Sequence, residues 1–345
     1  MAMVGFHYAL RYAHGELLPW RMATIEKMIQ YLYLGRVGYS EGLRLQAEIA
    51  ALRFAGRVEN VLLLLEHPPV LTLGRNADRA NVLASDELLA RRWVSVHEID
   101  RGGDVTYHGP GQLVGYPIFD LRSLRNPSGA RIGPVDFVRR MEEALMELCA
   151  GFGVRAGRIC GLTGVWCGVF EEAGNREQGS DVGGQGAGGR DPGSKANSPN
   201  EQAVACQTGL TGAARKIGAI GIHVSRGITT HGFAFNITTD LRDFELIVPC
   251  GIRDHAVTSL KNEILAQESR QLDEAPSLEV AAQRAAREFG LVFDQQVLLV
   301  ESLAALRAGA EATAVEPVFP AEDTPLRVPP AVERLRHNEG SPVRA

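Results

Sequence analysis

Short aliphatic runs that end at turn residues dominate the hydrophobic pattern of the chain. Val61–Leu65 is followed by Glu66 and then by His-Pro-Pro, and Val70–Leu73 is stopped by Gly74. Apolar runs of this length, bounded by proline or glycine, predict buried strands. By the same pattern, further strands are predicted at Val94–Ile99, Val105–Tyr107, Leu113–Phe119, Thr163–Phe170, Lys216–Val224 and Ile228–Ile237.

Longer stretches with apolar residues at helical spacing alternate with these strands. Ser40–Glu59 is predicted as a helix with Ser40 as its N-cap, and Ser85–Trp93 as a short helix with two acidic residues in its first turn. Pro134 suits the first position of a helix that ends near Cys149. Two more helices are predicted at Leu278–Phe289, with Gly290 just past its end, and at Gln296–Leu306.

The intermixed strands and helices predict an α/β (α+β) protein with a mixed β-sheet flanked by helices. Three segments depart from the pattern: a peripheral N-terminal extension at 1–27, a glycine-rich segment at 171–202, and a tail at 308–345 rich in Pro, Ala and Glu. The last two bury too little apolar surface to offset their ordering entropy. We therefore expect a single domain at 28–307 with a disordered insertion and a disordered tail.

Composition and charge exclude several classes of protein. The chain has 345 residues and a formal net charge of −5, which disfavours bulk nucleic-acid binding. Its apolar runs are too short to cross a bilayer, and no apolar run follows a basic start, so neither a membrane span nor a secretory signal is expected. The five cysteines include no CxxC pair, which favours reduced thiols and a cytoplasmic location.

The segment from Arg101 to Tyr116 is the first candidate for ligand binding. It holds five glycines and one proline, and glycine suits positions where the backbone must approach a ligand closely. Tyr107, His108 and Gln112 add polar groups around that backbone. A glycine-rich hairpin with an internally bonded histidine explains the same residues equally well.

Lys216 and Cys250 are the candidate catalytic pair. Lys216 is one of four lysines in the chain and lies in an apolar stretch, although an edge-strand lysine with its ammonium in water is the simpler explanation. Cys250 lies between Pro249 and Gly251, and the glycine would let a substrate carbonyl approach the sulfur. Most single cysteines are inert, so a nucleophilic Cys250 needs a nearby cation to stabilise its thiolate.

Other polar residues allow weaker hypotheses. His231 and Asn236 lie on a predicted strand with apolar neighbours. They are either core residues or side chains that line a pocket. Cys160 and Cys167 could join His108 or His231 at a metal, but their separation of seven residues is not a usual zinc spacing. The pair Gly102 and Gly103 is not followed by a phosphate-binding or dinucleotide-binding pattern. No metal and no cofactor is expected.

Several motifs together resemble the lipoyl(octanoyl) transferases. In chain order they are Glu66-His-Pro-Pro, Arg101-Gly-Gly, Thr106-Tyr107-His108, Gln112, Tyr116, Thr163-Gly-Val-Trp166, Arg215-Lys216-Ile, His231-Gly-Phe-Ala-Phe-Asn236 and Pro249-Cys250-Gly251. The resemblance covers about Leu32 to Leu260 and implies the fold of the biotin protein ligases and lipoate ligases. It also implies a cytoplasmic acyltransferase of lipoate biosynthesis. Such an enzyme moves an octanoyl group from octanoyl-acyl-carrier protein to a lysine on lipoyl domains of 2-oxoacid dehydrogenases and on the glycine cleavage H protein.

The resemblance also implies roles for individual residues. The acyl-carrying cysteine of the family falls on Cys250, and the lysine that lowers its pKa falls on Lys216. His231 and Asn236 are expected to support the site. The substrate-contacting stretches fall on Arg101, Gly102, Gly103, Asp104, Val105, Thr106, Tyr107 and His108, on Ala219, Ile220 and Gly221, and on Gly232, Phe233 and Ala234.

Two rival functions remain open from the sequence. A lipoate or biotin ligase would also use a lysine and glycine-rich loops, but it would require ATP and no cysteine nucleophile. A catalytically silent protein would only bind acyl carriers or lipoyl domains. The insertion at 171–202 and both termini depart from the family pattern.

Overall fold

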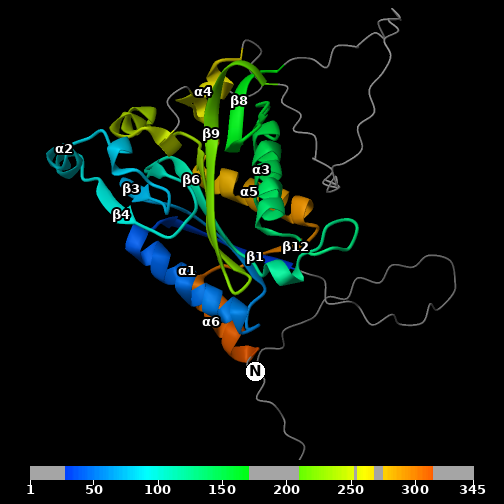
Figure 1. Ribbon diagram of the computed structural model, residues 1–345. Coiled ribbons are helices and arrows are strands. Elements are labelled where there is room, and N and C mark those ends of the chain that lie inside the picture. The colour runs from blue at the N-terminus through cyan, green and yellow to red at the C-terminus, as the bar shows by residue number, and fades with distance from the viewer. Residues whose placement is uncertain (1–27, 171–209, 252–254, 268–274, 314–345) are drawn as a thin grey trace, which may run out of the picture.

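A computed structural model describes residues 28–170, 210–251, 255–267 and 275–313 (Figure 1). The predicted extension at 1–27 and the insertion at 171–202 lie outside the described residues, as does most of the predicted tail. The strands are β1 (Met28–Arg36), β2 (Asn60–Glu66), β3 (Val70–Leu73), β4 (Ser95–Glu98), β5 (Val105–His108), β6 (Gln112–Ile118), β7 (Gly157–Ile159), β8 (Leu162–Phe170), β9 (Leu210–Ser225), β10 (Ile228–Asn236), β11 (Ala256–Val257) and β12 (Gln296–Leu299). The helices are α1 (Tyr39–Phe54), α2 (Asp86–Arg91), α3 (Pro134–Ala150), α4 (Leu260–Leu265), α5 (Leu278–Phe293) and α6 (Leu303–Ala312), with 3₁₀ turns η1 (Arg79–Asn81), η2 (Leu121–Ser123), η3 (Leu241–Leu246) and η4 (Pro249–Gly251).

A mixed sheet runs through the described part of the chain in the order β12-β1-β2-β6-β10-β9-β8-β7. The strands β12, β1 and β2 are parallel. Each following neighbour in this order, from the β2–β6 pair to the β8–β7 pair, is antiparallel, and β11 pairs with β9 in parallel. A smaller sheet has the order β4-β3-β5. The predicted mixed sheet flanked by helices is confirmed.

Strand β2 shows why the large sheet is covered on both faces. Leu62 and Leu64 pack in a core with α3 and α5, whereas Val61, Leu63 and Leu65 pack in a second core with α1 and α6. Alternate residues of a strand point to opposite faces, so a continuous aliphatic run requires an apolar layer on each side. Figure 1 shows the two helix pairs on different sides of the sheet.

The smaller sheet has its own core, and this core fixes the chain just before Cys250. Leu71, Val105 and Tyr107 pack there against Phe244 and Leu246 of η3. The backbone N–H groups of Leu83 and Ala84 both donate to the carbonyl of Leu246, at 2.9 and 3.1 Å. The segment that leads into η4 is therefore held against the small sheet.

Several predicted boundaries are wrong. Helix α1 begins at Tyr39 with Gly38 as N-cap, so Ser40 lies inside the helix. The predicted helix at Gln296–Leu306 is instead β12 followed by α6, because Gln296 to Leu299 pair in parallel with β1. Helix α6 continues to Ala312, beyond the predicted start of the tail at residue 308. The expectation of reduced thiols holds for the buried Cys149 and Cys167 but not for Cys160, which is disulfide-bonded.

Gly290 lies inside α5 rather than past its end. A Cβ atom there would lie 2.3 Å from Cγ2 of Val297, so the missing side chain lets β12 approach the helix. We expect Gly290→Ala to lower the free energy of unfolding by about 1–3 kcal/mol through overpacking. Gly309 in α6 is the matched control, because a Cβ there would meet nothing within 4 Å. Gly309→Ala should raise the stability by up to about 1 kcal/mol, and denaturant titration of both variants measures the contrast.

None of the helices in the described ranges is long and apolar enough to cross a membrane.

Candidate active site

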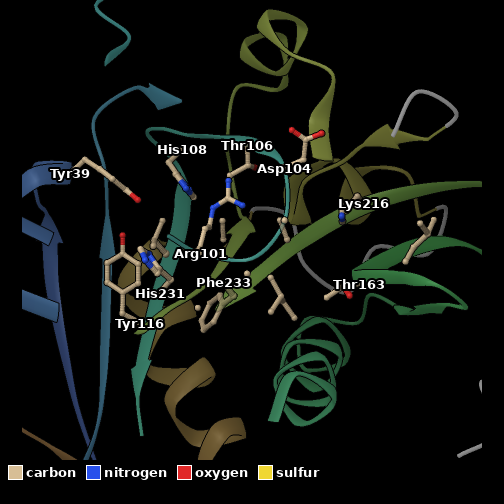
Figure 2. Close-up of a pocket in the computed structure, with 18 of the residues that line it drawn as sticks. Tyr39, Arg101, Asp104, Thr106, His108, Tyr116, Thr163, Lys216, His231 and Phe233 are labelled. Carbon is tan, nitrogen blue, oxygen red and sulfur yellow. The ribbon is translucent and has the colours of Figure 1, made fainter. Parts of the chain in front are cut away.

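A cavity of about 250 Å³ is lined by both sheets and by Tyr39 at the start of α1. Figure 2 shows Lys216 and Thr163 on one side of it and Tyr39, Tyr116 and His231 on the opposite side. The lining residues that the sequence had predicted are Arg101, Gly103, Asp104, Thr106, His108, Lys216, Ala219, Ile220, Gly221, His231, Gly232, Phe233 and Ala234. Residues far apart in the chain are thus brought together around one space.

Some predicted residues do not line the cavity. Val105 and Tyr107 point to the other face of β5, because successive residues of a strand alternate. The hydroxyl of Tyr107 donates to Oδ2 of Asp243 at 2.6 Å, and burial together with that carboxylate raises the pKa of Tyr107. Gly102 is not among the lining residues, and its N–H donates to the carbonyl of Ile222 at 3.0 Å.

The Arg101 loop is fixed to both sheets. Nη2 of Arg101 donates to the carbonyl and to the hydroxyl oxygen of Thr72 on β3, at 2.8 and 3.0 Å. On the other side the loop lies against β9, where a Cβ at Gly221 would be 2.6 Å from the carbonyl oxygen of Gly102. Glycine at 221 therefore permits the contact between the loop and the strand.

His108 is a neutral hydrogen-bond donor in a buried network. The amide of Gln112 donates to Oδ1 of Asn236 at 3.0 Å, and its oxygen faces Nδ1 of His108 at 2.8 Å. That oxygen can only accept, so the proton of His108 is on Nδ1. Burial lowers the pKa of His108 to about 3, which keeps the ring neutral. Asn236 in turn donates to the carbonyl of Thr258 at 2.9 Å, so the network reaches the segment after Cys250.

His231 is oriented by an unusual backbone conformation. Its φ is +55°, and its N–H donates to Oε1 of Gln46 on α1 at 2.6 Å. Its ring Nε2 lies 2.8 Å from Oδ1 of Asp100, and burial lowers the pKa of His231 despite that carboxylate. A left-handed backbone at a non-glycine residue is costly, and such residues concentrate at functional sites.

The turn that carries Cys250 lies beside Lys216 and the cavity. Lys216 is 8% exposed and pairs with Val257 of β11, and the N–H of Thr258 donates to the carbonyl of Lys216 at 2.9 Å. Pro249 and Lys216 line one small shared space. A Cβ at Gly251 would lie 2.6 Å from Oδ2 of Asp104, which itself lines the cavity. The backbone on both sides of Cys250 is therefore adjacent to the predicted lysine and to the cavity.

The sequence matches known proteins over this whole region. Residues 38–289 match the family of the lipoyl protein ligase A/B catalytic domain. An octanoyltransferase from Acidobacterium capsulatum is 50% identical over 80% of this chain and 94% of its own length. An octanoyltransferase from Koribacter versatilis is 42% identical over 90% of this chain and 98% of its own length. The chain belongs to the octanoyltransferase family. It is an acyltransferase enzyme.

Solved structures agree on the fold of this octanoyltransferase family member. A lipoate-protein ligase A bound with ATP has a TM-score of 0.50 at 13% identity and covers 83% of this chain and 96% of its own. A bi-partite lipoate protein ligase from Thermoplasma acidophilum has a TM-score of 0.50 at 13% identity and covers 82% and 90%. At this level of identity the similarity shows the fold alone.

The roles of three residues at or next to the site could not be predicted from the sequence. Tyr39 lines the cavity from the first turn of a surface helix, and Asp100 holds His231 from a loop. His67 lies in the Glu66-His-Pro-Pro motif, but its hydrogen-bond partners come from elsewhere in the chain. Its Nδ1 donates to the carbonyl of Val37 and its Nε2 accepts from the hydroxyl of Tyr116, both at 2.6 Å. Only the His-Pro-Pro motif itself pointed to this residue.

The buried His67 predicts acid sensitivity. Burial lowers the pKa of His67 to about 4 from an ordinary 6.5, so the folded state favours the neutral ring. Above pH 6.5 the His67 ring is neutral in both the folded and the unfolded state. As the pH falls towards 4 the unfolded state takes up a proton that the folded state does not, so the free energy of unfolding falls by about 3 kcal/mol. His67→Gln, which can still donate to the carbonyl of Val37, should show a shallower fall than wild type in urea titrations from pH 7 to pH 4. Parallel curves would contradict this assignment.

Proposed function

We propose that the protein transfers an octanoyl group from octanoyl-acyl-carrier protein to a specific lysine of lipoyl domains, through a thioester on Cys250. The acceptors would be the lipoyl domains of 2-oxoacid dehydrogenases and the glycine cleavage H protein, as a step of protein lipoylation in the cytoplasm. The observation that carries the proposal is the position of Lys216, which lies at the cavity and pairs with the segment that follows the Cys250 turn.

In the first half-reaction, the Lys216 ammonium stabilises the thiolate of Cys250. The thiolate attacks the thioester carbonyl of the octanoyl-carrier, a bond forms between the Cys250 sulfur and the acyl carbon, and the carbon–sulfur bond to the carrier breaks. The carrier sulfur leaves and takes up a proton from the Lys216 ammonium. Backbone N–H groups of the glycine-rich loops would stabilise the oxyanion that forms on the way.

In the second half-reaction, the neutral amine of the acceptor lysine attacks the Cys250 thioester. A carbon–nitrogen bond forms, the carbon–sulfur bond to Cys250 breaks, and Cys250 leaves as the thiolate. The neutral amine of Lys216 takes up the proton released by the acceptor nitrogen, which restores the ammonium beside the thiolate. Conversion of a thioester to an amide is downhill, so no ATP and no cofactor are required.

The cavity suits a slender aliphatic chain. Its lining alternates small residues, including Gly221, Gly232 and Ala234, with the apolar Phe233 and Ile220. Each buried methylene contributes about 0.8 kcal/mol, so the six of an octanoyl chain would contribute about 5 kcal/mol. At about 250 Å³ the cavity is smaller than typical pockets for drug-sized ligands, which run from about 300 to 1,000 Å³.

The test uses purified protein, octanoyl-acyl-carrier protein and an unmodified lipoyl domain, with no ATP. Intact mass of the lipoyl domain should show one octanoyl group, stable to hydroxylamine as an amide is. If product forms only from free octanoate with ATP, the protein is a ligase. If no product forms under either condition while the carrier or lipoyl domain is retained, it is a binding protein.

A further inference from the structure

The side chain of Lys216 lies over an aromatic ring. Its Nζ is 4.9 Å from the centroid of the Trp166 ring, and Trp166 is the residue that faces Lys216 across the β8–β9 ladder. Trp166 is 1% exposed and Lys216 is 8% exposed, so the contact is largely shielded from water. An ammonium within about 6 Å of an indole face is attracted by its quadrupole, and the attraction grows when water is excluded.

Trp166 is fully buried but lies outside the clustered apolar packing of the described residues. It belongs to none of the three hydrophobic clusters that the described residues form. Its Nε1 is buried without a hydrogen-bond partner among those residues, which is a cost that a phenylalanine would not carry. His255 packs edge-on against the ring at 5.2 Å, on the segment that follows Cys250. The indole thus contacts the predicted catalytic lysine and the segment that follows Cys250.

The strand that carries Trp166 is shaped around the lysine. Gly164 has φ +128°, and a Cβ there would lie 2.7 Å from Cε of Lys216. The N–H of Gly164 donates to Oε1 of Glu142 at 3.0 Å, and this fully buried carboxylate also accepts from Arg158 at 3.0 Å. A buried ionic anchor on α3 therefore fixes the backbone that leaves room for the lysine stem.

We propose that Trp166 is a positioning residue for Lys216, and that its ring face holds the ammonium in place beside the Cys250 turn. The inference rests on the proposed function, since it gives Trp166 its effect through the Lys216–Cys250 pair. Gly164 leaves the space in which the lysine side chain lies. A tryptophan with a purely structural role would affect stability without changing how Cys250 ionises.

The test compares Trp166→Leu, Trp166→Phe and the control Phe119→Leu. Phe119 is fully buried in the main core, away from the Lys216 contact, so its truncation reports the effect of lost packing alone. The readout is the alkylation rate of Cys250 by iodoacetamide as a function of pH, followed by mass spectrometry of the peptide that contains it. The rate of acylation by octanoyl-carrier is measured in parallel.

For Trp166→Leu we expect the midpoint of the alkylation profile to rise by roughly 0.5 to 1 pH unit, and acylation at neutral pH to slow about 3- to 10-fold. The difference should close at alkaline pH. Trp166→Phe should restore most of the wild-type profile, and Phe119→Leu should keep the wild-type midpoint even if its melting temperature falls. If Trp166→Leu does not fold, Trp166→Met replaces it, because methionine fills the space without a ring face.

A wild-type midpoint in the Leu or Met variant would overturn the positioning role. Failure of the proposed function would give a different result. Wild type itself would then form no octanoyl adduct, whatever the alkylation profile of the Trp166 variants.

Discussion

Cys250→Ala is expected to abolish octanoyl transfer, by more than about a thousandfold, because it removes the only atom proposed to carry the acyl group. The fold of the turn should survive. The N–H of Val248 donates to the carbonyl of Asn81 at 2.7 Å, and the N–H of Gly251 donates to the carbonyl of Val248 at 3.1 Å. Neither bond involves the side chain of Cys250. Transfer to a lipoyl domain, followed by intact mass, measures the loss.

The control for this variant is a second cysteine without a proposed role. Cys149 is a free thiol buried in α3, and burial raises its pKa well above the ordinary value, which makes it unreactive. Cys149→Ala should lose some stability but keep its transfer rate per folded molecule. Transfer by Cys250→Ala at a rate near wild type would remove the thioester step from the mechanism.

Lys216→Ala is expected to slow acylation by at least about 30-fold at neutral pH. Without the ammonium, the thiol of Cys250 should titrate nearer the ordinary cysteine value of about 8.5, so the anionic fraction at pH 7 falls. The sign of the effect follows: the defect should shrink as the pH rises through this value, because hydroxide then ionises the thiol without help. Single-turnover acylation between pH 6 and pH 10 measures the profile.

Lys261 provides the matched control for the lysine. It is exposed at the start of α4, so Lys261→Ala removes one positive charge of the same kind from elsewhere on the molecule. Its acylation profile should coincide with that of wild type. A Lys216→Ala profile with the wild-type shape and height would exclude the lysine from the reaction.

The parts of the fold that the sequence predicted well are those that short-range chemistry decides. Val70–Leu73 and the start of α3 at Pro134 have the predicted bounds, because Gly74 and the N1 proline end or begin an element locally. Strand β12 was missed because Gln296–Leu299 forms a strand only by pairing with β1, which lies more than 250 positions earlier. Such long-range pairing overrides local propensity.

In the site, too, local sequence predicts some features, whereas contacts between separate segments could not be predicted. The period of two along β5 implies that Thr106 and His108 share one face of the strand and that Val105 and Tyr107 lie on the other. The sequence alone therefore contains the division between lining and core residues on β5. The contacts of Trp166 with Lys216 and of Asp100 with His231 could not be predicted, because they join separate segments. Motif spacing carries no information about which ring lies under which ammonium.

The most direct test of the account is to locate the octanoyl group on the protein itself. Wild type is incubated with octanoyl-acyl-carrier protein without an acceptor, digested at low pH, and examined by peptide mass spectrometry. We expect one octanoyl group on the peptide containing Cys250, removable by hydroxylamine and transferred when a lipoyl domain is added. Continued transfer with Cys250 unmodified, or with the octanoyl group on another residue, would contradict it.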